Sequence, residues 1–344
     1  MGPKEDSLRT LPISNRPRRV EGPDLLLELS RKLVGQPHAI EQIVPYVEMH
    51  RARLAPDGRP VGVFLLLGPT GTGKTRTVEA LAEVLHGNAR QMLKVDCGEF
   101  QMEHEVAKLI GAPPGYLGHR ETQPMLTQQK LSAATSESSN LSLVLFDEIE
   151  KAAPSMTRLL LGVLDKATLR LGDNTTVNFE RSLIFLTSNL GAREMARQIH
   201  PDFGFEAMMG GSRPKLGKKL AAIGASAVKR KFSPEFINRI DAIVTYQPLD
   251  APSLAAIVDQ QIVELERHIE NRLGDDAFEL DVSAEARAWL LRKGTSDEYG
   301  ARELKRVLLR HLTQPLAAMV AAGEIEPEDL VHVDAGAGGL EITI

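Results

Sequence analysis

A glycine-rich octapeptide constrains this chain more than any other feature of its sequence. It follows an apolar run from Val61 to Leu67 and leads into a segment with helical spacing that ends at His86. A strand, a glycine-rich loop and a helix in this order form a P-loop, whose backbone N–H groups bind phosphate oxygens at the helix N-terminus. We therefore expect Gly68, Pro69, Thr70, Gly71, Thr72, Gly73, Lys74 and Thr75 to bind ATP. Lys74 should reach the β- and γ-phosphates, and the Thr75 hydroxyl should hold Mg²⁺.

A second apolar run, Leu143 to Phe146, ends in the acidic pair Asp147 and Glu148. An acidic side chain at the tip of a buried strand can bind the metal directly or through its water, which is the role expected of Asp147. Glu148 is then placed to polarise a water for attack on the γ-phosphate. An apolar strand that ends in Asp-Glu is common by itself, but after a P-loop it indicates a site that hydrolyses ATP.

Further apolar runs alternate with helical segments along the first part of the chain. The expected strands are 61–67, 92–95, 143–146, 183–186 and 242–246, and the expected helices are 75–86, 104–110, 125–134 and 155–167. This alternation predicts an α/β fold with a parallel sheet flanked by helices. A small hairpin is expected to turn at Gly172, Asp173 and Asn174.

The character of the chain changes near its ends. Residues 1–23 are predicted to be a flexible basic and proline-rich tail, with a transit peptide as the alternative, and residues 24–248 to be the large ATPase domain. Residues 249–344 are expected to form a small, mainly helical lid domain, with helices over 253–273, 284–293 and 301–321 and short strands over 278–282, 330–333 and 340–343.

Composition excludes some classes of function. The formal net charge of -5 argues against broad binding to nucleic acid, which needs a concentrated basic face. Its one cysteine, Cys97, forbids an intramolecular disulfide and fits a reducing compartment, so a cytoplasmic location is expected. We expect no membrane partner, because no apolar run approaches the ~18 residues that a membrane span requires.

Seven segments in order carry a resemblance to a known family. The chain resembles the second nucleotide-binding module of the Clp unfoldases and disaggregases of the ClpB, ClpA and ClpC type, within the AAA+ superfamily, here as a stand-alone single module. The segments are 34–36, 68–75 (Walker A), 110–118, 146–152 (with Walker B), 187–191, 234–241 and 299–302.

The resemblance implies roles for further residues. Asn189 would be a polar sensor that orients the attacking water, Arg239 an arginine finger that reaches the γ-phosphate in the next subunit, and Arg302 a second sensor on the same phosphate. Val34 and Gly35 would line the adenine pocket, while Tyr116 and Leu117 would form the pore loop that grips polypeptide. The implied protein is a chaperone that assembles into a homo-oligomeric ring, expected to be a hexamer, and threads unfolded or aggregated polypeptide through its pore.

Some positions depart from the family pattern. Residues 119–124 lack the expected Glu-Gly-Gly run, and Phe203-Gly204-Phe205 matches only in part the loop that docks protease-coupled members on a ClpP-like peptidase. Such a peptidase or an adaptor is therefore a weaker partner prediction, and no recruitment domain is expected before Leu33. The alternatives left open are a nucleotide-regulated assembly scaffold, the unfoldase subunit of a ClpP-like protease, and a nucleic-acid remodeller.

Overall fold

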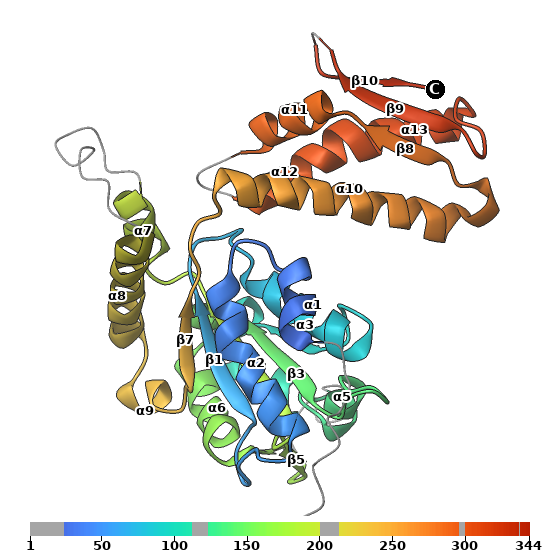
Figure 1. Ribbon diagram of the computed structural model, residues 1–344. Helices are drawn as coiled ribbons and strands as arrows, with labels where there is room; N and C mark the ends of the chain where they lie inside the picture. Colours follow the sequence, from blue (N-terminus) through green and yellow to red (C-terminus); the bar gives the residue numbers. More distant parts are fainter. Residues whose placement is uncertain (1–23, 112–122, 200–212, 296–299, 337) are drawn as a thin grey trace, which may run out of the picture.

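The computed structural model describes residues 24–111, 123–199, 213–295, 300–336 and 338–344 (Figure 1). Its centre is a five-stranded sheet in the order β2-β3-β6-β1-β7, and every neighbouring pair is parallel. The strands are β1 (Gly62–Leu67), β2 (Leu93–Asp96), β3 (Ser142–Asp147), β6 (Ser182–Ser188) and β7 (Ala242–Thr245). The predicted parallel α/β fold is therefore confirmed, and β6 lies between the P-loop strand and the acidic strand.

Both faces of the sheet are buried, which explains why its strands are continuous apolar runs. On one face, Phe64 and Leu66 pack in a core with α1 (Leu25–Lys32), α2 (Pro37–Arg51) and α3 (Lys74–His86). On the other face, Leu65 and Leu67 belong to a core that includes α6 (Pro154–Lys166) and α9 (Pro234–Ile237). Successive side chains of a strand point to opposite faces, so one run supplies both cores.

Shorter elements connect these layers. They are η1 (Cys97–Glu99), η2 (Glu103–Val106), α4 (Ala107–Ile110), α5 (Gln128–Ala133), η3 (Ile149–Lys151), β4 (Thr168–Arg170) and β5 (Thr176–Asn178). The predicted hairpin is present as the antiparallel pair of β4 and β5. The helix predicted over 104–110 is only partly correct, because its first turn is the 3-10 turn η2 and regular α-helix begins at Ala107.

Two helices beside β7 were missing from the sequence prediction: α7 (Ala192–Ile199) and α8 (Arg213–Lys231) (Figure 1). Interior glycines weaken the helical signal of α8, since glycine is a poor helix former. The fold uses Gly224 for close packing, because a Cβ there would lie 3.0 Å from Met195 Cε and 3.2 Å from Leu67 Cδ1.

The C-terminal elements form a second, smaller domain above the carboxyl ends of the large sheet (Figure 1). Its elements are α10 (Ala251–Leu273), η4 (Gly274–Asp276), β8 (Glu279–Val282), α11 (Ala284–Gly294), α12 (Ala301–Leu308), η5 (Leu309–Thr313), α13 (Gln314–Ala322), β9 (Leu330–Ala335) and β10 (Leu340–Thr343). The π-helical turn η5 interrupts the helix expected over 301–321 just before Pro315, which has no N–H to donate. In the described parts of the chain, no helix combines the length and the apolar character needed to cross a membrane.

Candidate functional site

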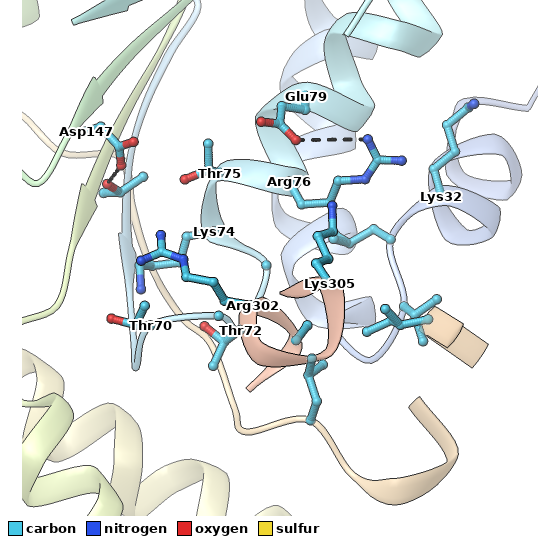
Figure 2. Close-up of a pocket in the computed structure, with 18 of the residues that line it drawn as sticks. Lys32, Thr70, Thr72, Lys74, Thr75, Arg76, Glu79, Asp147, Arg302 and Lys305 are labelled. Atoms are coloured by element: carbon cyan, nitrogen blue, oxygen red, sulfur yellow. Dashed lines mark hydrogen bonds and ion pairs between the residues drawn. The ribbon is translucent and has the colours of Figure 1, made fainter. Parts of the chain in front are cut away.

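A cavity of about 590 Å³ opens where the carboxyl ends of β1, β3 and β6 face the small domain. This volume falls within the ~300–1,000 Å³ typical of small-molecule sites. Its lining includes Thr70, Gly71, Thr72, Gly73, Lys74 and Thr75 of the P-loop, with Asp147, Glu148 and Asn189 beside them. Most of the predicted site residues thus come together around one space (Figure 2).

Two glycines give the P-loop its path. Gly68 has φ +147°, and a Cβ there would lie 2.8 Å from the carbonyl oxygen of Tyr246, so a side chain would push the loop away from the end of β7. Gly73 precedes the first residue of α3 with φ +104°, a left-handed conformation that glycine adopts without steric cost. The chain therefore turns from β1 into α3 with the helix N-terminus at the cavity, where its dipole attracts anions.

The ammonium of Lys74 is the buried cation of the site. The residue is 8% exposed, and its Nζ donates to the carbonyl oxygens of Gly68 (2.6 Å) and Pro69 (2.8 Å) and to Asn189 Oδ1 (2.9 Å). Burial lowers the Lys74 pKa to about 8, and the positive charge of Arg302 adds to this effect. All three acceptors are neutral groups, so this buried cation fits an anionic ligand such as a phosphate.

Asp147 is fixed by two side chains from neighbouring strands. Its Oδ1 accepts a hydrogen bond from the Thr187 hydroxyl of β6, and its Oδ2 lies 3.0 Å from Lys94 Nζ of β2. The same Thr187 oxygen accepts the backbone N–H of Glu148 at 3.0 Å. Sequence reasoning missed the roles of Thr187 and Lys94, although Thr187 opens the recognised segment 187–191 and Lys94 lies on a predicted strand.

Glu148 and Asn189 connect the acidic strand to the P-loop. Glu148 has φ +57°, a conformation that costs a non-glycine residue ~1–3 kcal/mol and that clusters at functional sites. Its Oε1 accepts from Asn189 Nδ2 at 3.3 Å, while its Oε2 pairs with Lys151 Nζ at 2.5 Å. Since Asn189 Oδ1 accepts from Lys74, one amide bridges the buried cation and the acidic side chain.

Four apolar residues also line the cavity. They are Leu33, Val34, Leu249 and Ile257. Gly35 is not among the described lining residues, but it has φ +79° and a Cβ there would lie 2.8 Å from Leu249 Cδ2. Gly35 therefore lets the start of the small domain approach, and this role differs from direct lining of an adenine pocket.

Gln36, which belongs to the recognised segment 34–36, joins the P-loop to the end of the large domain. Its side chain is fully buried, and Nε2 donates to the carbonyl oxygens of Thr72 (3.1 Å) and Gln247 (2.7 Å). Its Oε1 accepts the backbone N–H of Gln247 at 3.3 Å. Sequence reasoning gave this residue no role of its own.

The small domain supplies further cations. Arg302 and Lys305 of α12 line the cavity (Figure 2), and the Ala301 N–H donates to the Gly71 carbonyl oxygen at 3.2 Å. Arg76, on the first turn of α3, also lines it and lies 3.1 Å from Glu264 of α10. Sequence reasoning had not identified Lys32, Arg76 and Lys305 as lining residues.

Among the described residues, four predicted site residues are not part of the cavity lining: Gly35, Gly68, Pro69 and Arg239. Arg239 instead pairs with Asp165 of α6, with Nε 3.2 Å from Oδ1. Tyr116 and Leu117 lie outside the described residues, as do Phe203-Gly204-Phe205 and Tyr299.

The donor set fits a nucleotide with a magnesium ion. Cationic side chains and a helix N-terminus line the cavity, as phosphates require. The Thr75 hydroxyl and the Asp147 carboxylate line the same space and offer the oxygen ligands that Mg²⁺ prefers. The apolar side chains of Val34 and Leu249 offer a surface for a base.

Comparisons with known proteins agree with this geometry. A family model described as an AAA domain (Cdc48 subfamily) matches residues 59–243, and a model of the C-terminal, D2-small domain of ClpB protein matches residues 249–333. The chaperone protein ClpB of Streptomyces albus G is 39% identical over 313 residues, which are 91% of this chain and 33% of that protein. The ClpB of Meiothermus ruber is 38% identical over 316 residues, 92% of this chain and 34% of that protein.

Solved structures give the same result. A closed-state cryo-EM reconstruction of Hsp104 with ATPγS and FITC casein matches 92% of this chain and 51% of that chain, with a TM-score of 0.75 and 31% identity. The extended S. cerevisiae Hsp104:casein complex matches with a TM-score of 0.77 and 29% identity, over 93% of this chain and 52% of that chain. The chain spans about one third of the length of the curated relatives, and the first family model covers more than half of the chain. It belongs to the AAA+ ATPase family and, within it, to the Clp type that ClpB and Hsp104 represent.

Proposed function

We propose that this chain hydrolyses ATP to ADP and phosphate and uses the energy to unfold or remodel protein. The observation that carries the proposal is the link from Lys74 through Asn189 to Glu148 at the mouth of the P-loop. Lys74, the proposed phosphate-binding cation, and Glu148, the proposed general base, contact the same side-chain amide. A site that only bound nucleotide would not need the carboxylate.

Each residue of the site has a proposed role in hydrolysis. The N–H groups of the P-loop and Lys74 hold the β- and γ-phosphates, and Arg302 adds positive charge from the small domain. Thr75 and Asp147 would hold Mg²⁺, which neutralises phosphate charge when bound. Glu148 accepts a proton from the attacking water, and Asn189 orients that water. Val34 and Gly35 would form part of the adenine pocket.

Arg239 and the pore loop require more than one copy of the chain. We propose a homo-oligomeric ring, a hexamer as in the family resemblance, in which Arg239 of one copy reaches the γ-phosphate held by the next. The unfolded or aggregated polypeptide would pass through the centre and be gripped by Tyr116 and Leu117. The solved structures of Hsp104 with casein support a polypeptide substrate by analogy.

The remaining predictions stay proposals of this kind. We place the domain boundary at 248/249, because the two family models match on either side of it, and the flexible tail at residues 1–23. The cytoplasm is the proposed compartment on the basis of the single cysteine. An adaptor or ClpP-like peptidase stays a sequence prediction, since residues 203–205 lie outside the described part.

An unfolding assay tests the proposal. A fluorescent protein with an unfolded extension should lose fluorescence in the presence of this protein and ATP, and the Glu148→Gln variant should cause no loss. Tyr116→Ala should keep basal ATP hydrolysis but lose the unfolding activity. ATP hydrolysis without any unfolding, by wild type and Tyr116→Ala alike, would refute the threading function and leave only the ATPase.

A further inference from the structure

The guanidinium of Arg239 is held by its own subunit. Its Nε lies 3.2 Å from Asp165 Oδ1, its Nη2 lies 3.5 Å from Asp165 Oδ2, and its Nη1 donates to the Glu235 carbonyl oxygen at 3.4 Å. Asp165 therefore accepts one hydrogen bond, from Nη2, while the buried Nε has no hydrogen-bond partner and contacts the carboxylate as an ion pair. Together with the hydrogen bond from Nη1 to the Glu235 carbonyl, these contacts restrict the orientation of the guanidinium.

Both partners stand on firmly packed elements. Asp165 is in the last turn of α6, whose residues Met156, Leu160, Val163 and Leu164 are buried in the core. Arg239 follows α9, which is capped by the Ser233 hydroxyl and anchored by the buried Phe236. The contact thus connects two elements that are anchored in the core, the last turn of α6 and the residues that follow α9.

The contact cannot be explained by stability. The side chains of Arg239 and Asp165 are 28% and 43% exposed, and ion pairs of this exposure contribute only ~0–1 kcal/mol. An arginine side chain carries about 2 kcal/mol of rotamer entropy, however, and fixing it in advance removes this cost from a later interaction. What Asp165 provides is orientation of the guanidinium.

We propose that Asp165 is a positioning residue for Arg239, and that it orients the guanidinium for the phosphate of a nucleotide held by a neighbouring copy of the chain. The inference rests on the proposed function, because it requires Arg239 to act between subunits. It assigns Asp165 to the side of the interface that donates the arginine, and not to the nucleotide cavity of its own subunit, whose described lining does not include it.

A mixing experiment separates the two sides of the interface. Glu148→Gln subunits cannot hydrolyse ATP but still offer Arg239, whereas Arg239→Ala subunits keep their own cavity but offer no arginine. Each variant alone should be inactive, and an equimolar mixture should recover activity at the sites where both meet. Adding Asp165→Asn to the Glu148→Gln donor should lower this recovered rate by ~10-fold, because a misplacement of about 1 Å in a catalytic group can cost up to ~10²-fold in rate. The KM for ATP should stay within about 2-fold, because binding of the substrate is left intact.

Matched variants complete the test. Asp259→Asn in the donor also removes a carboxylate from an arginine pair, with Arg287 at 3.0 Å, but on the small domain, and it should leave the recovered rate unchanged. Asp165→Glu in the donor should restore part of the lost rate. Full recovery with the Asp165→Asn donor would overturn the inference, as would an equal loss when Asp165→Asn is placed in the Arg239→Ala partner instead. No recovery in the mixture of Glu148→Gln and Arg239→Ala subunits would refute the shared site itself. This outcome differs from a loss that appears only when Asp165→Asn is added to the donor.

Discussion

The hydroxyl of Thr187 connects the two acidic residues of the proposed active site. It donates to Asp147 Oδ1 and accepts the backbone N–H of Glu148, and the residue is 1% exposed. Thr187→Val keeps the shape of the side chain and removes only this hydroxyl. Thr187→Ser keeps the hydroxyl and removes a methyl group, so the two variants separate hydrogen bonding from packing.

The expected magnitudes differ in stability and in activity. In Thr187→Val the N–H of Glu148 loses its partner, a loss of ~1–3 kcal/mol for a buried group. The Asp147 carboxylate is 21% exposed, so water replaces part of what it loses. We therefore expect Thr187→Val to lower the free energy of unfolding by about 1–3 kcal/mol. Thr187→Ser loses one methyl group, or about 0.8 kcal/mol.

Activity should separate the variants more sharply. Thr187→Val frees Asp147 and the backbone of Glu148 to move, and a shift of about 1 Å in a catalytic group can cost up to 10²-fold in rate. We expect kcat for ATP hydrolysis to fall by at least ~10-fold in Thr187→Val and by less than ~3-fold in Thr187→Ser. Urea unfolding and steady-state hydrolysis, with Glu148→Gln as the blank, measure both quantities. Equal kcat and equal unfolding free energy in the two variants would refute the assigned role of the hydroxyl.

Further predictions concern the cation, the domain contact and the metal. The Lys74 pKa is lowered from 10.5 to about 8, so between these two pH values the unfolded chain binds more protons than the folded chain. The free energy of unfolding of wild type should therefore rise relative to that of Lys74→Met, by up to about 3 kcal/mol, as the pH rises from 8 to 10.5. Urea unfolding of both proteins at pH 7 and pH 10 measures this change, and an equal stability difference at the two pH values would contradict it. Gly35→Ala should weaken nucleotide binding by ~10-fold or more, because its Cβ would lie 2.8 Å from Leu249 Cδ2 and the φ of residue 35 is +79°. Calorimetric titration with ADP measures the affinity, and an unchanged affinity would exclude a role for the close approach of Gly35 and Leu249 in nucleotide binding. Lys94→Met should lower the Mg²⁺ concentration needed for half-maximal ADP binding by ~3–10-fold, because the ammonium paired with Asp147 no longer competes with the metal. If the variant needs a higher Mg²⁺ concentration than wild type, Lys94 assists metal binding instead.

The sequence predicted the structure best where a single physical requirement determines which residue types can occur. The P-loop needs glycines at fixed places, and strands buried on both faces need continuous apolar runs, so both could be recognised without coordinates. Asp147 and Glu148 were identified because they end such a strand. Their proximity to Asn189 followed only from the strand order, which places β6 beside β3.

Other features depend on contacts between distant segments. Lys94 and Lys305 are ordinary charged residues locally, and only the sheet order and the docked small domain bring them to the cavity. The helix α8 was missed because Gly224 lowers helix propensity, whereas its packing against Met195 and Leu67 is visible only in three dimensions. These features depend on interactions between residues that are far apart in the sequence, and a local sequence pattern does not reveal such interactions.

The central claim is that ATP is hydrolysed at a site completed between copies of this chain. The most direct test is the steady-state rate of ATP hydrolysis per subunit, measured against protein concentration for wild type, Arg239→Ala and the Glu148→Gln blank. We expect the wild-type rate per subunit to rise cooperatively as rings assemble, and the Arg239→Ala rate to stay near that of the Glu148→Gln blank at every concentration. A rate per subunit that does not change with concentration, in a protein that sedimentation shows to be monomeric, would contradict the claim.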